Sequence, residues 1–228
     1  MKSKKIVCFG NSVGIRVRPN KGKCKSYADL LNDNEELSFE NFCYSGNMIG
    51  SISRNPDFIL QKHADVVILQ FGVVELSSRS TSKNLYDYLN YKAKSTRLGQ
   101  FIQTVGLSLE SKLRRALVYL RFKSSWYHSD RFLSELETTI KSLDSNSLSK
   151  IICIGISTPS ERIEKNLPGT IRRIKNVQFK MRAICSKYQS CNYLDVEHFE
   201  TNYLPDGIHF SAEGHRKVYN DLLCLINN

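Results

Sequence analysis

Residues 6–13 read IVCFGNSV, an uninterrupted apolar run followed by a glycine and two polar residues. An apolar run that ends at a turn signal indicates a strand buried on both faces. Gly10 permits a sharp turn after this strand, and the turn places Asn11 and Ser12 at the strand's carboxyl end. Ligands of parallel sheets bind beyond the carboxyl ends of the strands. The segment therefore predicts a first strand that leads into a polar site.

Four further apolar runs predict strands, at residues 37–44, 63–71, 151–156 and 191–196. Helical patterns such as 26–32 and 177–189 lie between them. Strands that alternate with helices predict a three-layer α/β/α sandwich around a parallel sheet of about five strands. We expect one domain over residues 1–228, with a last helix that begins near Ser211, a good N-cap residue.

The stretch from about 77 to 149 is too long for a single crossover helix. We expect it to form several helices, inserted between the third and fourth strands as a lid or insertion. Within it, Leu109, Leu113, Leu117 and Leu120 recur at helical spacing. Such a stripe more often faces the core than a membrane, and we expect it to pack inward.

The net charge of +11 is concentrated in residues 79–123, where ten Lys and Arg residues against two acids leave about eight positive charges. A positive face attracts an acidic polymer, nucleic acid or an anionic membrane surface, and a solvated helical face is an equally good interpretation. We expect no nucleic-acid partner, because the segment has no recognised binding motif and no regular interleaving of aromatic residues. Peripheral membrane contact stays open.

The composition indicates a cytoplasmic protein without a transmembrane segment. No apolar run approaches membrane-spanning length, and the basic, then apolar N-terminus is interrupted at Gly10 too early for a signal peptide. The seven cysteines are scattered and include no Cys-x-x-Cys pair, which fits a reducing compartment. We expect no metal and no cofactor.

Residues 204–211 read LPDGIHFS, in which Asp206 precedes His209 by three positions. A serine hydroxyl needs a base within hydrogen-bond reach, and the base needs an acceptor that orients it. Ser12, His209 and Asp206 supply these groups, with Asp206 accepting from one ring nitrogen and Ser12 bonded to the other. Each motif alone has an ordinary structural explanation, a strand-to-helix turn for Ser12 and a helix-capping turn for Asp206. The glycine turn at 10–14 also resembles a phosphate-binding turn, but incompletely.

Taken together, the motifs resemble the SGNH/GDSL hydrolase family, in separated blocks that leave out residues 77–149. The blocks are Gly10-Asn11-Ser12, Tyr44-Ser45-Gly46-Asn47 and Asp206-Gly207-Ile208-His209. The resemblance implies a flavodoxin-like strand order 2-1-3-4-5, a nucleophile at Ser12, and Asp206 and His209 as the other triad members. It also implies an oxyanion hole formed by the N–H groups of Ser12 and Gly46.

Two positions depart from the family pattern. Asn11 stands where the family usually has aspartate, and Val74 stands where it usually has an asparagine that donates to the oxyanion. Loss of such a donor costs on the order of a hundred- to a thousandfold in turnover. Asn47 is a candidate substitute donor.

Arg16 and Arg18 closely follow Ser12 and are candidate substrate-binding residues. The guanidinium group makes forked hydrogen bonds to carboxylates and phosphates, which suits an acidic sugar or another anionic substrate. Surface ion pairing is the alternative interpretation.

The favoured function is serine-dependent cleavage of an O-acyl ester, with an O-acetyl ester on a carbohydrate-like substrate as the preferred case. An O-acyltransferase of polysaccharide biosynthesis is the first alternative, since a sugar hydroxyl in place of water captures the same acyl-serine. A catalytically weakened module that binds an acidic glycan is the second. The sequence predicts no oligomeric state.

Overall fold

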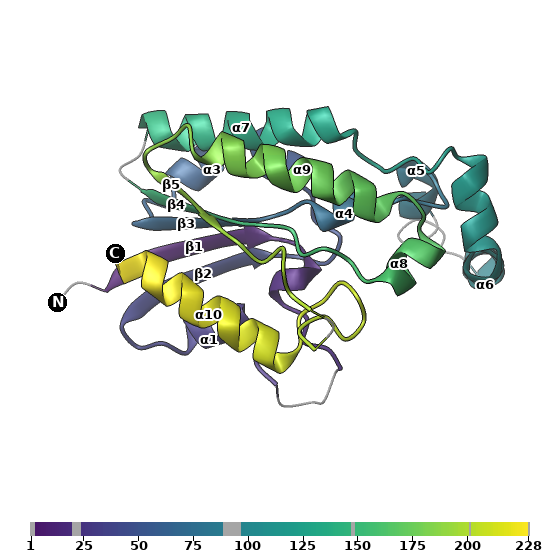
Figure 1. Ribbon diagram of the computed structural model, residues 1–228, viewed down its shortest axis with the longest axis horizontal. Coiled ribbons are helices and arrows are strands. Elements are labelled where there is room, and N and C mark those ends of the chain that lie inside the picture. Colours follow the sequence, from purple (N-terminus) through teal and green to yellow (C-terminus); the bar gives the residue numbers. More distant parts are fainter. Residues whose placement is uncertain (1–2, 20–23, 89–96, 147–148, 201, 228) are drawn as a thin grey trace.

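The computed structural model describes residues 3–19, 24–88, 97–146, 149–200 and 202–227. Its centre is a five-stranded parallel sheet with the order β2-β1-β3-β4-β5 (Figure 1). The strands are β1 Lys4–Gly10, β2 Leu37–Cys43, β3 Val66–Gln70, β4 Lys150–Ile154 and β5 Cys191–Leu194. The predicted sheet and the strand order implied by the resemblance are confirmed.

The strand register brings three turns to one edge of the sheet. Gly10, the last residue of β1, pairs with Cys43 at the end of β2 and with Gln70 at the end of β3. The turns that follow these three strands therefore begin side by side at the carboxyl edge. The inner strands β3 and β4 are almost entirely buried, whereas the edge strand β2 is largely half-exposed, as expected for a strand with one open side.

Helices cover both faces of the sheet (Figure 1). On one face lie α1 Tyr27–Asn32 and α10 Ala212–Asn227. On the other lie α2 Gly50–Ser53, α3 Asp57–Leu60, α7 Ser129–Asn146 and α9 Thr170–Cys185. The expected cap is present at the last helix, because the Ser211 hydroxyl accepts a hydrogen bond of 3.1 Å from the Gly214 N–H. The three layers are those predicted.

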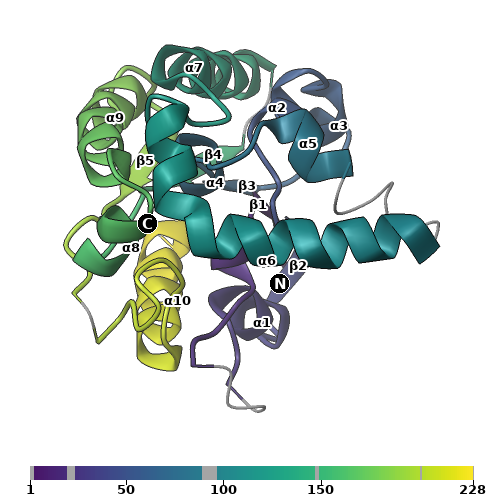
Figure 2. The same cartoon turned by 90° about the vertical axis from the view of Figure 1, so that its right-hand side faces the viewer.

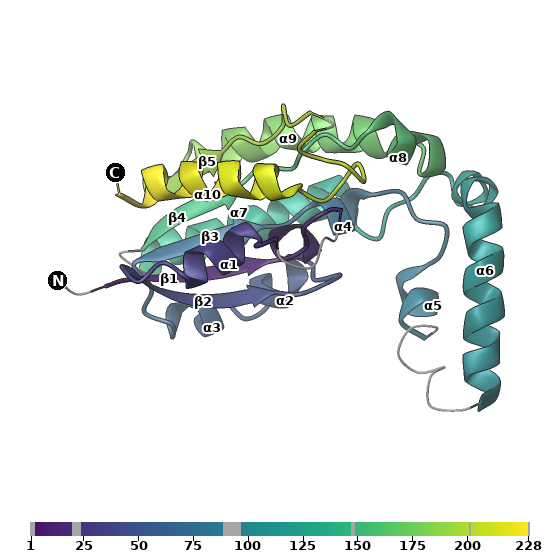
Figure 3. The same ribbon diagram turned by 90° about the horizontal axis from the view of Figure 1, so that it is seen from below.

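The segment between β3 and β4 is helical, as expected, but only part of it stands apart from the layers. It contains α4 Val73–Leu76, α5 Lys83–Asp87, α6 Arg97–Leu120 and α7. α7 covers the sheet and packs on α9. Figure 3 shows α5 and α6 beyond the carboxyl edge of the strands, with α8 Glu161–Asn166 beside one end of α6.

The prediction that the leucine stripe of α6 faces the core is wrong. Leu109, Leu113 and Leu120 are 55%, 46% and 74% exposed. The helix contacts the rest of the protein through its other side, where Val118 is completely buried. Helical spacing determines which residues share a face, but not whether that face is covered. In the part of the chain that the structure describes, no helix has the length and apolar character required to cross a bilayer.

Candidate active site

The turn after β1 holds Ser12 at the carboxyl edge of the sheet. Asn11 is fully buried, and its side-chain Oδ1 accepts from the Val13 N–H at 3.1 Å. Its backbone N–H donates to the Gln70 carbonyl on β3 at 3.3 Å. Asn11 therefore caps the short 3-10 helix η1, Ser12–Gly14, whose first residue is the candidate nucleophile. An asparagine oxygen performs this capping without the negative charge of the family's aspartate.

Ser12, His209 and Asp206 form one continuous chain of hydrogen bonds. Ser12 Oγ lies 3.0 Å from His209 Nε2, and His209 Nδ1 lies 2.8 Å from Asp206 Oδ2. An ionised carboxylate only accepts hydrogen bonds, so Nδ1 carries the ring proton and donates it to Asp206. Nε2 is then free to accept from the Ser12 hydroxyl. The three residues singled out from the sequence thus have the geometry of a nucleophile, its base and the orienting acid.

The turn at 206–209 fixes Asp206 as well as His209. The second carboxylate oxygen, Oδ1, accepts from the backbone N–H groups of Ile208 and His209 at 3.0 and 2.7 Å. Burial alone would raise the pKa of Asp206, but the hydrogen bonds from the His209 ring and from these two N–H groups hold its pKa well below the ordinary value. Gly207 has φ +86, and a Cβ there would overlap the Ser160 hydroxyl, so this turn requires glycine.

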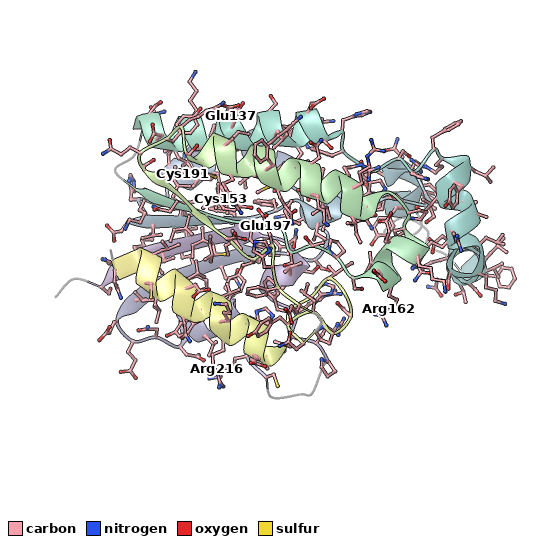
Figure 4. The ribbon with its side chains drawn as sticks, in the orientation of Figure 1. Glu137, Cys153, Arg162, Cys191, Glu197 and Arg216 are labelled. Atoms are coloured by element: carbon pink, nitrogen blue, oxygen red, sulfur yellow. The ribbon has the colours of Figure 1, made fainter. Side chains whose placement is uncertain are left out.

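Two arginines lie beside Asp206. Arg18 Nε lies 3.4 Å from Asp206 Oδ2, and the Arg18 N–H donates to the Phe210 carbonyl at 2.9 Å. Arg162, on α8 beside the loop that carries Asp206 (Figure 4), donates to the Asp206 carbonyl at 2.8 Å. The structure thus places Arg18 against Asp206, and its role toward substrate stays a prediction. Arg16 instead donates to the Ser45 hydroxyl at 2.8 Å, next to the turn with Gly46.

The turn after β2 supplies the second candidate oxyanion donor. Gly46 has φ +77, and a Cβ built there would point into open space. Neither its N–H nor that of Ser12 donates to another group within the described parts of the chain. The side-chain amide of Asn47 donates to the Gly10 carbonyl at 3.1 Å, which ties this turn to the end of β1. The substitute-donor role of Asn47 therefore stays a prediction.

The third turn, after β3, is held by a buried acid that the sequence analysis did not identify. Glu75 is completely buried, and its two oxygens accept from the Ile49 N–H at 2.8 Å and the Gly72 N–H at 2.9 Å. Burial raises the pKa of Glu75 to about 7, although these two hydrogen bonds oppose the rise. Glu75 joins the turn after β3 to the segment that follows Gly46. The sequence signal was its position one residue after Val74, in the block that departs from the family pattern.

Val74→Asn is expected to raise the rate of ester hydrolysis by up to about a hundredfold. The new asparagine could donate a hydrogen bond to the oxyanion, and one such donor contributes about this factor to turnover. Val74 is buried on α4, so the new amide must find a partner or destabilise the fold. The measurement is turnover of p-nitrophenyl acetate, after circular dichroism has shown a folded variant. An unchanged rate in a folded variant would indicate that another donor already acts.

His215 is a fully buried histidine that the sequence analysis missed. Its Nδ1 accepts from the Tyr27 N–H at 3.1 Å, so Nε2 carries the proton and donates to the Arg16 carbonyl at 3.1 Å. These bonds join α10 and α1 to the loop between Ser12 and Arg18. Burial lowers the pKa of His215 to about 4. Its position in α10, four residues after Ser211, was the one available signal.

The neutral state of His215 predicts a loss of stability in acid. An unfolded histidine titrates near pH 6.5, so between about pH 6.5 and 4 the unfolded chain binds a proton that the folded chain does not. The contribution of His215 to the free energy of unfolding is therefore complete above pH 6.5 and falls as the pH falls, by on the order of 3 kcal/mol. Urea unfolding at several pH values should show a smaller acid loss in His215→Gln than in the wild type. The exposed His198→Gln is the control, and a wild-type acid loss in His215→Gln would contradict the prediction.

No protein-family model matches the sequence, and no curated protein matches it at a significant level. Solved structures do match over almost the whole chain. The lipase/acylhydrolase from Enterococcus faecalis is 18% identical with a TM-score of 0.62, over 98% of this chain and 95% of that chain. An alpha/beta hydrolase enzyme from the metagenome of Lake Arreo is 15% identical with a TM-score of 0.61, over 98% and 95%.

An acetylxylan esterase from Geobacillus stearothermophilus is 14% identical with a TM-score of 0.60, over 99% of this chain and 94% of that chain. At these identities the likeness concerns the fold. It agrees with the sheet order and layers that the resemblance to SGNH/GDSL hydrolases implied. The chain has the three-layer fold of lipase/acylhydrolase and acetylxylan esterase structures.

Proposed function

We propose that the protein is a serine-dependent hydrolase that cleaves O-acyl esters through an acyl-serine intermediate, with an O-acetyl ester on a carbohydrate-like molecule as its substrate. The observation that carries the proposal is the hydrogen-bonded chain from Ser12 Oγ through His209 to Asp206. A serine acyl-transfer site of the Ser-His-Asp kind consists of these three groups in this order. They lie at the carboxyl edge of the sheet, where ligands of this architecture bind.

In the acylation step, Ser12 Oγ attacks the ester carbonyl carbon while His209 Nε2 takes the hydroxyl proton. The carbonyl oxygen becomes negatively charged, and the N–H groups of Ser12 and Gly46 are the candidate donors to it. The bond between the carbonyl carbon and the alcohol oxygen then breaks. His209 returns the proton to that oxygen, so a free alcohol leaves and the acyl group remains on Ser12.

In the deacylation step, His209 takes a proton from water as the water oxygen attacks the acyl-serine. Collapse of the second tetrahedral intermediate breaks the bond to Ser12 Oγ, which recovers its proton from His209. Asp206 stays ionised in both steps and stabilises the protonated ring, which its low pKa permits. This chemistry needs only side-chain and backbone groups of the chain and one water.

The choice of an acetylated carbohydrate rests on the structural likeness to an acetylxylan esterase. That esterase has also been solved as catalytic mutants in which a serine or a histidine is replaced by alanine. In this chain, Arg16 donates to the Ser45 hydroxyl and so adds a positive charge beside the turn with Gly46. An ester on an acidic sugar is therefore the preferred form of the substrate.

The proposal is tested by labelling with a fluorophosphonate, which reacts only with an activated serine. Mass spectrometry of the digested protein should find the label on Ser12. A folded protein that is not labelled there would overturn the assignment of the nucleophile. Product analysis with acetylated xylo-oligosaccharides then separates the reactions, since a hydrolase releases acetate whether or not a sugar acceptor is present, whereas a transferase moves the acetyl group to the acceptor.

A further inference from the structure

α6 carries a row of exposed apolar side chains along the side that points away from the protein. We call it the outer face, and it consists of Phe101, Val105, Leu109, Leu113 and Leu120. The first four follow one another at four-residue steps, and Leu120 lies seven residues, or about two turns, after Leu113, so all five lie on one side of the helix. Phe101 is 67% exposed, and Phe122, just after the helix, is 94% exposed. An apolar row of this length on a helix surface indicates that something covers it.

The opposite side of α6 already has its partners, and most of them are polar. Glu110 is bonded to the Ser80 hydroxyl and forms a double contact with Arg114, at 2.9 Å for each bond. Val118, two turns after Glu110, is completely buried. The helix is thus amphipathic, but its more polar side faces the protein. Packing within the described chain therefore leaves the outer face uncovered.

Basic side chains flank the outer face without acidic partners. Lys112 and Arg115 are exposed, and no ion pair of either is found in the described part of the chain, although Arg115 lines a groove that also includes Glu161 and Glu164 of α8. Lys123, just beyond the helix, lies over the ring of Tyr119 at 4.9 Å. The one acid of α6, Glu110, is already paired on the inner side. The outer face thus combines an apolar surface with positive charge.

We propose that the outer face of α6 docks on an anionic lipid surface. A basic amphipathic helix lies in the plane of such a surface, where its apolar side chains enter the interface and its Lys and Arg side chains meet the lipid head groups. A second copy of the chain is a poorer occupant, because each copy has a net charge of +11 and carries the same basic residues beside this face. This proposal does not depend on the proposed hydrolase activity.

Docking in this way has a consequence for the orientation of the protein. Figures 2 and 3 show α6 across the carboxyl end of the sheet, the end at which η1 and Ser12 follow β1. The inner side of α6 contacts the protein at this end, so its outer face points outward from it. A lipid surface bound there would be nearer to the catalytic edge of the sheet than to the chain termini, which lie at the opposite end.

The test is co-sedimentation of the purified full-length protein with two kinds of vesicle. One contains phosphatidylglycerol and phosphatidylcholine, and the other contains phosphatidylcholine alone. The wild type should sediment with the anionic vesicles at low salt and much less at high salt, because salt screens the attraction between charges. It should bind the neutral vesicles at least about tenfold more weakly.

Two variants separate the apolar and the electrostatic contributions. Leu109→Glu/Leu113→Glu should lower the partition coefficient by at least about tenfold, because both side chains would have to leave the interface. Lys112→Gln/Arg115→Gln should lower it by about fivefold for each charge removed. The matched controls are Phe179→Glu, an exposed aromatic on α9, and Lys141→Gln/Arg216→Gln, two exposed cations away from α6 (Figure 4 shows Arg216 on α10). The controls should bind as the wild type does.

Several outcomes would overturn the proposal. One is a wild type that stays in the supernatant with anionic vesicles at low salt. Another is equal binding by Leu109→Glu/Leu113→Glu and the wild type, with circular dichroism showing both folded. A third is a wild-type dimer in analytical ultracentrifugation that the same variant dissociates and that does not bind vesicles, which would assign the outer face to a second copy. The charge variant keeps the apolar residues, so it remains informative if the glutamate variant does not fold.

Discussion

Ser12→Ala is expected to lower the turnover of p-nitrophenyl acetate by on the order of 10⁴-fold or more, with the fold unchanged. The loss should be large because, in the proposed reaction, the hydroxyl oxygen forms the acyl intermediate, and this oxygen lies 3.0 Å from the base, His209 Nε2. Ser12 is buried at the start of η1. The side chain that caps this helix is that of Asn11, so the Ser12 hydroxyl is not needed for the cap. Removal of one hydroxyl there should leave the thermal midpoint nearly unchanged.

The measurement is the initial rate after subtraction of the rate without enzyme. Ser51→Ala, an exposed serine on α2, is the matched control and should retain the wild-type rate. A folded Ser12→Ala variant that hydrolyses the ester as fast as the wild type would remove Ser12 from the role of nucleophile. A small residual rate is compatible with the assignment, since oxyanion donors and binding alone accelerate such reactions by about 10³-fold or more over water.

The sheet and the triad were predictable because their signals are local. The apolar runs at 6–9 and 151–154 are buried, and a short, uniformly apolar run bounded by turn signals is typical of an inner strand of a parallel sheet. Ser12 and His209 each lie in a short motif that has an ordinary explanation on its own, and the combination of the motifs made them recognisable. The loop after β5 and the packing of α10 on α1 bring His209 to Ser12, although 197 positions separate them in the chain.

Other features depend on contacts that a sequence pattern does not contain. The spacing of the α6 leucines is the same whether the stripe is buried or exposed. The sequence therefore could not predict that this stripe is left uncovered by the rest of the chain. The position of Arg18 against Asp206 depends on the path of the loop after η1, which turns toward Phe210. The expected helix at 177–189 differs from the observed one for a related reason. The structure has α9 at Thr170–Cys185, so the helix begins seven residues earlier. Its first turn is only partly buried and lacks a strong apolar period.

Glu75 and His215 show a further limit of the sequence. Both are buried titratable residues whose partners are backbone N–H and C=O groups, and every residue type offers those groups. No motif therefore marks such a position. Each nevertheless supports the site, because Glu75 connects the turns after β2 and β3, and His215 connects α1 and α10 to the loop with Arg16.

Replacement of the other two triad members should show that they act as a unit. His209→Ala is expected to lower turnover by on the order of 10⁴-fold or more, because it removes the ring nitrogen that is bonded to Ser12 Oγ and would take its proton. Asp206→Ala should cost less, on the order of 10³- to 10⁴-fold, because the imidazole is retained but loses the carboxylate that fixes its proton on Nδ1. The double variant should be hardly slower than His209→Ala, since Asp206 acts on the reaction only through the ring.

Asp206→Asn tests the effect of Asp206 on the His209 tautomer separately from its effect on the turn at 206–209. An asparagine Oδ1 can still accept from the N–H groups of Ile208 and His209, so the turn should survive. Its Nδ2 would face His209 Nδ1 and donate to it, which moves the ring proton to Nε2, where it blocks proton transfer from Ser12. Turnover should therefore fall by on the order of 10⁴-fold while the thermal midpoint stays closer to that of the wild type than it does in Asp206→Ala. If the losses of His209→Ala and Asp206→Ala instead add in the logarithm of the rate, or if Asp206→Asn turns over at the wild-type rate, then Asp206 does not act through His209.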